Sequence, residues 1–479
     1  MGVPHPYGVK PSGNAYLASS NSGFVSRKRG LGRFSVLGDA LIMKFMGDFV
    51  DALCLVKLSE CSKAMYCAVN AHDAMWKCFS VALLEKKEKD DSNDGVNVGV
   101  EFRFCGTWRA TFHYLASRGT SSHIPRNFGS YFSDALYQPW LFAHATVLDR
   151  WLARDNVARE HAASLSQSDF IEKYEIPGIP CLILGALDEW TSVREWTMGR
   201  LRDMLKNQTF RVGPFDIPFC AFADYVRDHS EENPLYLFDC KFGEKCDALL
   251  RGYQVPKYFC GDDRDLFACL SKEARPDFRW LIVGAAKSGS KWHVDPNKTC
   301  AWNAAIFGRK KWIMLPPGYP PPGVCPSPDG GLVAQPVSLM EWFTNYYESM
   351  RETMGDKVVE FVAQPGECVF VPSGWWHCVL NLDASCAITQ NYVSSSNLGN
   401  ALEFFEHSAD HISGIASPNV KRDFLTIFRG ALEKTHVELL GCVDNNKECK
   451  RRKIEETRSF VREAKQSAQE APFSFKFFS

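Results

Sequence analysis

The feature that most constrains the fold of this 479-residue sequence is a series of short runs of β-branched, aromatic and aliphatic residues beginning near Ile179. Glycine, proline and aspartate separate the runs, as turn residues separate the strands of all-β domains. About eight such strands suit a double-sheet jelly roll. The expected strands are Cys181–Leu184, Leu235–Phe238, Trp280–Val283, Cys300–Ile306, Lys311–Leu315, Glu367–Val371, Cys378–Asn381 and Ala387–Asn391. The predicted fold is mixed, with a cupin-like double-stranded β-helix core between helical segments.

Helical patterns flank this core. Apolar residues recur at spacings of three and four from Phe34 to Leu84, and a helical pattern returns after Ser395. The expected organisation is a flexible basic tail (1–33), a helical module (34–84), a charged linker (85–100), an aromatic-rich helical connector (101–170), the jelly roll (171–400) and C-terminal helices with a basic patch (401–479). The acid-poor tail leaves a transit segment open as an alternative. The patch, Lys450 to Lys453, is either a nuclear address or a charged helix face, and it favours a nuclear or nucleo-cytoplasmic location.

Composition narrows the function classes. With 55 Lys and Arg against 56 Asp and Glu, the net charge of −1 gives no global attraction to nucleic acid or to an acidic membrane surface. RNA binding therefore has no support from charge, and no stretch reads as a membrane helix. The 18 cysteines include no Cys-x-x-Cys pair, so reduced thiols are the simplest interpretation. A homodimer is left open.

A candidate metal site lies within the strand-rich region, at His293-Val-Asp295. In a strand, residues i and i+2 point to the same face, so the imidazole and the carboxylate can reach one ion. His377, 84 residues later, offers a third ligand from a distant strand. Two histidines and one carboxylate form the facial triad of non-haem Fe(II) oxygenases, which leaves coordination positions open. Taken alone, a His-x-Asp match is weak evidence for a metal site, because a lone buried histidine is more often a core residue than a metal ligand.

An iron of this kind requires a bidentate co-substrate. If that molecule is 2-oxoglutarate, its distal carboxylate needs a cation and a hydroxyl or amide in an apolar pocket. Lys310 follows Asp295 across a Gly308-Arg309 turn and can return beside the metal, although a surface lysine of a hairpin is the plain alternative. Further candidates are Thr389 and Asn391, which share one face of a late strand, and Asn303, which lies on the strand before Lys310.

From about residue 165 to 400 the sequence resembles a JmjC-domain oxygenase of the bifunctional arginine demethylase and lysyl-hydroxylase branch, also called the phosphatidylserine receptor. The resemblance rests on Pro234–Asp239, Tyr253–Phe259, Arg279–Trp280, His293–Pro296, Ala301–Ala304, Val369–His377, Val379–Asp383 and Ala387–Asn391. Two stretches depart from the family pattern: Ala285-Ala286-Lys287 replaces Pro-Pro-Arg, and Lys291-Trp292 replaces Gly-Ile. These departures bear on the protein substrate rather than on the metal chemistry.

The resemblance implies roles for nine residues. The Fe(II) ligands would be His293, Asp295 and His377; the 2-oxoglutarate-binding residues Lys310, Thr389 and Asn303; and the residues lining the active cavity Tyr236, Trp280 and Asn391. It further implies O₂ as the oxidant, ascorbate as a reductant, and lysine or arginine side chains of proteins such as histones and splicing factors as substrates.

Residues 34–84 resemble an F-box, which implies binding to a Skp-type ubiquitin-ligase adaptor. The order of modules is similar to that of plant and algal F-box JmjC proteins, although Leu37-Gly38 stands where an F-box has Leu-Pro. A helical cap on the next domain explains the same spacing. The alternatives to a protein hydroxylase or demethylase are therefore an F-box receptor whose JmjC domain only binds, and the same iron chemistry on RNA or a small molecule.

Overall fold

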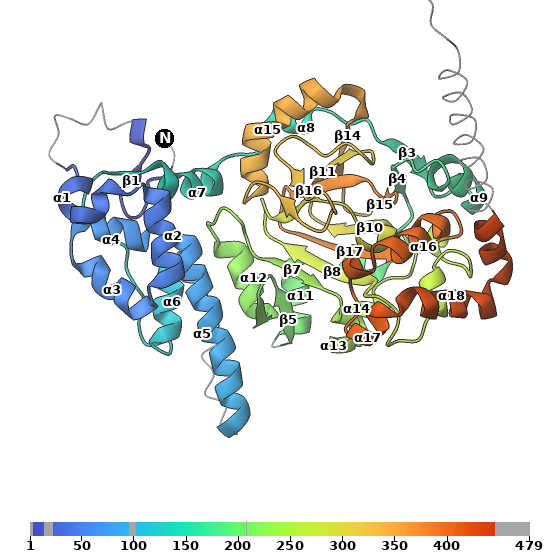
Figure 1. The fold of residues 1–479 in the computed structure, drawn as a ribbon, viewed down its shortest axis with the longest axis horizontal. Helices are drawn as coiled ribbons and strands as arrows, with labels where there is room; N and C mark the ends of the chain where they lie inside the picture. Colours follow the sequence, from blue (N-terminus) through green and yellow to red (C-terminus); the bar gives the residue numbers. More distant parts are fainter. Residues whose placement is uncertain (1–2, 14–22, 95–101, 207, 446–479) are drawn as a thin grey trace, which may run out of the picture. The chain divides into compact units, whose positions relative to one another are not determined.

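The computed structural model describes residues 3–13, 23–94, 102–206 and 208–445, with the backbone alone over residues 85–94 (Figure 1). It divides into two compact units: Met1–Tyr258 with Arg279–Asp295 and Ala301–Asn391, and Phe259–Phe278 with Pro296–Cys300 and Tyr392–Ser479. The basic patch Lys450 to Lys453 and parts of the expected tail and linker lie outside the described residues. Within the described chain, no helix combines the length and the apolarity that crossing a membrane requires.

The first unit begins with short helices whose ends are set by capping side chains. Asp51, Ser62 and Thr107 each accept a hydrogen bond from the backbone N–H three residues ahead, which satisfies a free donor of the first helical turn. The helices are α1 (Arg27–Leu31), α2 (Asp39–Phe49), α3 (Ala52–Glu60), α4 (Lys63–Asn70), α5 (Asp73–Asp94), α6 (Trp108–Ala116), α7 (Asp134–His144) and α8 (Asp149–Leu152). A two-residue parallel pair joins β1 (Val9–Lys10) to β2 (Tyr131–Phe132).

Two sheets form the centre of the first unit. The larger has the strand order β3-β4-β15-β10-β17-β8-β7-β5-β6 and the smaller β14-β11-β16-β9. Their strands are β3 (Ala158–His161), β4 (Cys181–Leu184), β5 (Thr209–Val212), β6 (Phe215–Pro218), β7 (Tyr236–Asp239), β8 (Arg279–Gly284), β9 (Gly289–His293), β10 (Cys300–Phe307), β11 (Lys310–Leu315), β14 (Val359–Ala363), β15 (Cys368–Val371), β16 (Trp376–Asn381) and β17 (Ser385–Tyr392). Each expected run of residues coincides with one of these strands, so the predicted jelly-roll core is confirmed.

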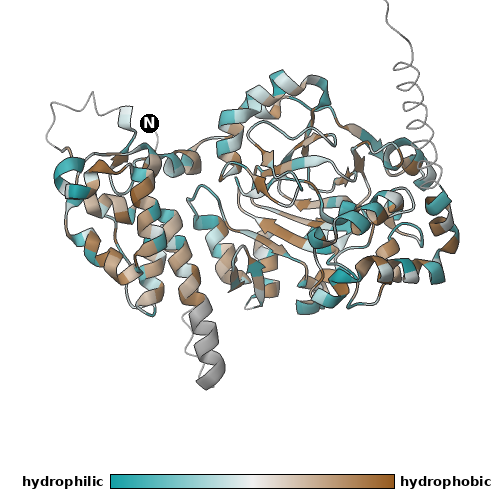
Figure 2. Cartoon of the chain, viewed as in Figure 1, coloured by the Kyte–Doolittle hydropathy of each residue, from teal (hydrophilic) through white to brown (hydrophobic). Residues whose placement is uncertain are grey.

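One apolar core lies between the two sheets. Ala301 and Val369 from the larger sheet pack in the same buried cluster as Trp312, Met314 and Val379 from the smaller one. Figure 2 shows the strands of both sheets in predominantly hydrophobic colours, as expected for strands covered on both faces. The interior of the roll is therefore largely apolar, apart from the polar groups that specific residues bring into it.

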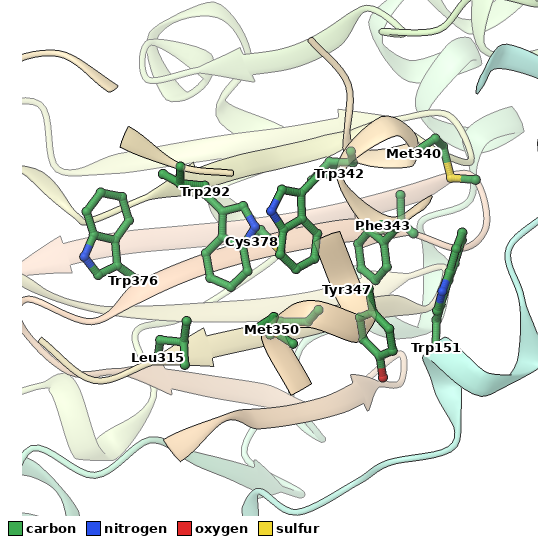
Figure 3. Packing of buried hydrophobic residues seen from close by; sticks show 14 of the residues in the cluster. Trp151, Trp292, Leu315, Met340, Trp342, Phe343, Tyr347, Met350, Trp376 and Cys378 are labelled. Atoms are coloured by element: carbon green, nitrogen blue, oxygen red, sulfur yellow. The ribbon is translucent and has the colours of Figure 1, made fainter. Parts of the chain in front are cut away.

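Helix α15 (Leu339–Met354) packs on the smaller sheet and was not anticipated from the sequence. Its apolar face supplies Trp342, Phe343 and Tyr347 to a second cluster, in which the rings of Trp292 and Trp342 lie 5.0 Å apart at 66° (Figure 3). Trp151 of α8 closes the far end of the cluster. Because Trp292 precedes the predicted ligand His293, this packing also fixes the strand that carries the ligand.

The remaining elements of the first unit are short. They are α9 (Gln167–Phe170), α10 (Thr191–Glu195), α11 (Met198–Leu205), α12 (Phe219–Asp228), α13 (Phe242–Lys245), α14 (Asp247–Arg251), β12 (Cys325–Pro326) and β13 (Val333–Ala334).

The second unit contains α16 (Leu398–His407), α17 (Pro418–Arg422) and α18 (Phe424–Thr435). Its core is aromatic, built around Phe267, Phe405, Phe424 and Phe428. No disulfide joins the cysteines that the structure describes.

Candidate metal centre and co-substrate pocket

The structure brings His293, Asp295 and His377 together at one end of the smaller sheet. His293 closes β9, Asp295 follows two residues later, and His377 lies on β16 directly opposite His293 in the antiparallel register. The two histidine Nε2 atoms lie 3.9 and 4.0 Å from Asp295 Oδ1. One ligand atom from each residue lies within 4.8 Å of the other two, and among the described residues this is the single cluster of potential metal ligands.

The two imidazoles are held in the tautomer that a metal requires. His293 Nδ1 lies 2.7 Å from the carbonyl oxygen of Lys291, and His377 Nδ1 lies 3.0 Å from that of Trp375. A carbonyl accepts only, so each Nδ1 carries the proton and donates it, leaving the Nε2 lone pair free for an ion. Burial, reinforced by the neighbouring His293, lowers the pKa of His377 to about 4, so this ring stays neutral at physiological pH.

The carboxylate of Asp295 shows that the three residues fit a cation. Its Oδ2 atom is buried and has no hydrogen-bond partner within the described part of the chain. An unpaired buried carboxylate oxygen costs free energy unless a proton or a metal ion compensates it. Two imidazoles and one carboxylate match the ligand set of non-haem iron, which leaves further coordination positions open.

A buried lysine lies in the same interior. The Lys310 side chain is 1% exposed, and its Nζ donates to Asn381 Oδ1 at 2.8 Å and to Ser385 Oγ at 3.1 Å. The next residue, Lys311, is equally buried, but its Nζ lies 2.9 Å from a carboxylate oxygen of Glu360. Lys310 has neutral acceptors only among the described residues, and burial lowers its pKa to about 8. A buried cation without a carboxylate partner is suited to bind an anionic ligand.

The other predicted residues occupy the facing sheet. Thr389 lies on β17 opposite Trp280 of β8, and its hydroxyl donates to the Trp302 carbonyl at 2.8 Å. Trp280 stacks on Phe238 with ring centres 5.4 Å apart. Asn303 of β10 and Asn391 of β17 are both buried. Thus the metal cluster and Lys310 come from the smaller sheet, whereas the remaining candidates come from the larger one.

Tyr236 connects the two groups. Burial raises the pKa of its hydroxyl above the ordinary value, and the side chains of Ser290 and Asn381 lie within hydrogen-bonding reach and oppose that rise. Ser290, Asn381 and Ser385 did not emerge as candidates from the sequence. Short polar residues in strands carry no distinctive signal, and only the strand register places these three beside Lys310 and Tyr236.

Comparison with known proteins agrees with this geometry. A model of the family described as JmjC domain, hydroxylase, matches residues 280–392. The arginine-specific demethylase JMJ22 of Arabidopsis thaliana is 38% identical over 478 residues, spanning 98% of this chain and 89% of that protein. This chain belongs to the JmjC family. Two more distant relatives match about half of this chain. The bifunctional arginine demethylase and lysyl-hydroxylase psr-1 of Caenorhabditis elegans is 35% identical over 51% of this chain and 63% of that protein. The 2-oxoglutarate and iron-dependent oxygenase JMJD4 of Mus musculus is 27% identical over 51% of this chain and 62% of that protein.

As a JmjC oxygenase, the chain depends on iron and 2-oxoglutarate, and its interior suits both. An iron ion held here would supply, together with 2-oxoglutarate, the oxidising power for hydroxylating a C–H bond. The imidazoles of His293 and His377 and the carboxylate of Asp295 would hold the ion, and Lys310 would offer its charge to a carboxylate. The apolar side chains between the sheets would keep water away from the reacting groups.

Proposed function

We propose that this chain hydroxylates lysine side chains, or removes methyl groups from N-methylarginine or N-methyllysine, in proteins such as histones or splicing factors. The observation that carries the proposal is the cluster of His293, Asp295 and His377. The same roll contains the buried Lys310, whose charge no carboxylate neutralises among the described residues. The proposed substrate class is supported by the similarity, along 98% of this chain, to JMJ22, an arginine-specific demethylase. The proposed roles of Thr389 and Asn303 are co-substrate binding, and those of Tyr236, Trp280 and Asn391 are lining the cavity.

The proposed reaction consumes O₂ and 2-oxoglutarate and releases succinate and CO₂. One oxygen atom of O₂ enters succinate and the other enters the C–H bond of the substrate. Hydroxylation of an N-methyl group gives a hemiaminal that loses formaldehyde and leaves the demethylated amine, whereas hydroxylation of a lysine side-chain carbon gives a stable alcohol. Ascorbate would keep the iron in the ferrous state between turnovers.

The experiment that tests this proposal is a turnover assay with Fe(II), 2-oxoglutarate and ascorbate on a panel of peptides carrying lysine, methyl-lysine and methylarginine. Mass spectrometry separates the two outcomes, because demethylation removes a methyl group and hydroxylation adds one oxygen atom. Modification of RNA or of a small molecule in the same panel, with every peptide unchanged, would favour the alternative of the same chemistry on another substrate.

His293→Ala provides the matched inactive variant, and His407→Ala provides the control, because His407 lies exposed on α16 in the other unit. We expect His293→Ala to abolish succinate formation while the protein stays folded, and His407→Ala to leave turnover unchanged. Undiminished turnover of His293→Ala would contradict the oxygenase assignment of this site.

A second candidate function is adaptor binding by the helical module, as the resemblance to an F-box implies. The observation that favours it is a solvent-exposed row of apolar side chains on α2. Leu41, Phe45 and Phe49 are spaced four residues apart and are 54, 42 and 77% exposed. The Phe34 ring lies 6.2 Å from the Phe45 ring at a tilt of 37°, and Leu53 at the start of α3 is 75% exposed. Solvent-exposed apolar rows of this kind are typical of protein-binding surfaces.

We propose that a Skp-type ubiquitin-ligase adaptor occupies this row. In a pull-down with the purified adaptor, the wild-type chain should retain it, and Phe45→Glu combined with Phe49→Glu should lose it with unchanged thermal stability. Glu60→Ala, at the exposed end of α3, is the control for a surface change outside the row. If the double variant retained the adaptor equally well, the result would favour the alternative that residues 34–84 only form a helical cap on the next domain.

The proposed location is nuclear or nucleo-cytoplasmic, in keeping with histone or splicing-factor substrates. Its basis is the run Lys450-Arg-Arg-Lys453 in the sequence. Replacing all four residues by alanine should shift a fluorescent fusion out of the nucleus, and an unchanged distribution would remove this basis.

A further inference from the structure

The co-substrate pocket contains an amide whose orientation is fixed by its neighbours. Asn381 is fully buried on β16 and lies directly opposite Lys310 of β11 in the antiparallel register. Both of its backbone groups are bonded to the segment before β9, because its N–H donates to the Ser288 carbonyl at 2.9 Å and its carbonyl accepts from the Lys287 N–H at 2.8 Å. The side chain therefore projects beside the Lys310 ammonium from a rigid strand.

The direction of each hydrogen bond follows from a chain of donors and acceptors. The Ser288 hydroxyl donates to the Ala285 carbonyl, which can only accept, at 2.6 Å. The hydroxyl has a single proton, so it must accept from its other partner, the Asn381 side chain at 2.9 Å. The amide nitrogen of Asn381 accordingly faces Ser288, and Oδ1 faces the Lys310 ammonium at 2.8 Å. Ser288 thus prevents the amide from turning its nitrogen toward a positive charge.

The Tyr236 ring lies in the same group of side chains, because it and the Ser288 hydroxyl both lie next to Gly284. Gly284 makes this arrangement possible, since a Cβ atom there would overlap both the Ser288 hydroxyl and the Tyr236 ring. The small residue at position 284 thereby leaves room for the Ser288 hydroxyl that orients Asn381.

We propose that Asn381, oriented by Ser288, is the positioning residue of the co-substrate pocket. It holds the Lys310 ammonium in place for the distal carboxylate of 2-oxoglutarate without neutralising the lysine charge. The neutrality of the amide is essential to this role. A carboxylate in its place, like Glu360 beside Lys311, would neutralise the cation before the co-substrate arrives. This inference rests on the proposed use of Lys310 for 2-oxoglutarate.

The deciding variant is Asn381→Asp, which keeps the size and shape of the side chain and adds one negative charge. We expect the affinity for N-oxalylglycine, an unreactive 2-oxoglutarate analogue, to fall by about tenfold or more, because the new carboxylate competes with the ligand for Lys310. The measurement is calorimetry on the full chain loaded with Zn(II), with zinc binding and thermal unfolding recorded in parallel. Ser288→Ala should weaken analogue binding by a smaller factor, because it frees the amide to rotate without adding charge.

Asn156→Asp is the matched control, because Asn156 hydrogen-bonds only backbone groups, at Val358 and Glu360. If Asn381 were merely structural, analogue affinity would track thermal stability across all three variants. Unchanged affinity in folded Asn381→Asp would overturn the inference, and if that variant failed to fold, unchanged affinity in Ser288→Ala would do so. Failure of the wild-type chain to bind the analogue would instead contradict the assignment of Lys310 to the co-substrate, so the two failures are distinguishable.

Discussion

At the scale of single residues, the sequence predicts three candidate metal ligands, and the structure brings these three side chains together. His293 and Asp295 are two residues apart, so the alternation of side chains along a strand places them on one face. His377 joins them if a second strand lies beside the first. Lys310 was ambiguous, because a surface hairpin lysine has the same sequence context. The structure places Lys310 and Lys311 on opposite faces of one strand, and only the former lacks a carboxylate partner among the described residues. That difference depends on register across β11, β14 and β16, which composition and spacing do not encode.

The first prediction concerns the pH dependence of co-substrate binding. Lys310 has a pKa lowered to about 8 by burial, and the neighbouring Cys386 thiol, whose pKa burial raises to about 12, stays neutral throughout this range. Raising the pH through 8 removes the ammonium charge that would bind the carboxylate. Affinity for N-oxalylglycine should therefore be level below pH 8 and fall by about tenfold per pH unit above it.

Calorimetry of the zinc-loaded chain between pH 7 and pH 9.5 measures this profile. Lys310→Arg is the matched variant, because a guanidinium keeps its charge across the range. Its affinity should be lower than that of the wild type at pH 7 and should not decline above pH 8. A declining profile in Lys310→Arg would assign the titration to another group.

At the scale of elements, the hydrophobic runs predicted the strands but not their partners. Each expected strand forms, because runs of apolar residues bounded by turn residues favour strands regardless of context. Helix α15 was missed, since its aromatic residues lie in a segment that follows a proline-rich stretch and resembles irregular chain. The pairing of β9 with β16, which sets His293 opposite His377, also could not be predicted. It contains a register shift between His377 and Val379 that no local pattern signals.

The second prediction concerns that pairing. Gly289 opens β9 with φ +147°, and a Cβ atom there would overlap the carbonyl oxygen of Val379 on β16. Gly289→Ala should push the two strands apart, lower the free energy of unfolding by roughly 2 kcal/mol or more, and weaken zinc binding as the histidines separate. Thermal unfolding and metal titration measure both effects.

Gly430→Ala is the control for this change. Gly430 lies in α18, with no atom within 4 Å of its would-be Cβ, and alanine favours a helix. It should leave metal binding unchanged and should not destabilise the chain. Gly289→Ala with wild-type metal affinity would show that the strand contact does not control the ligand geometry.

At the scale of the whole molecule, the helical module and the jelly roll share buried polar contacts within the first unit. Glu231, which follows α12, accepts hydrogen bonds from the Lys77 ammonium of α5 at 2.7 Å and from the Trp108 indole of α6 at 3.0 Å. The Tyr225 hydroxyl donates to its other oxygen. Trp108 also stacks on Phe215 of β6 with ring centres 5.5 Å apart and nearly parallel planes. One side of the helical module is thus tied to the oxygenase core, whereas the apolar row on α2 remains exposed.

The last prediction tests how strongly this contact joins the two regions. The side chains of Lys77 and Glu231 are 19% and 7% exposed, so removal of the lysine charge leaves a mostly buried carboxylate without its cation. Lys77→Met should cost about 3 kcal/mol of unfolding free energy. Adding Glu231→Gln should recover part of that loss, because the amide oxygen can still accept from Trp108 without carrying a charge. Denaturant unfolding of the two single variants and the double variant gives the coupling energy, and strictly additive losses would mean that the pair does not hold the helical module to the core.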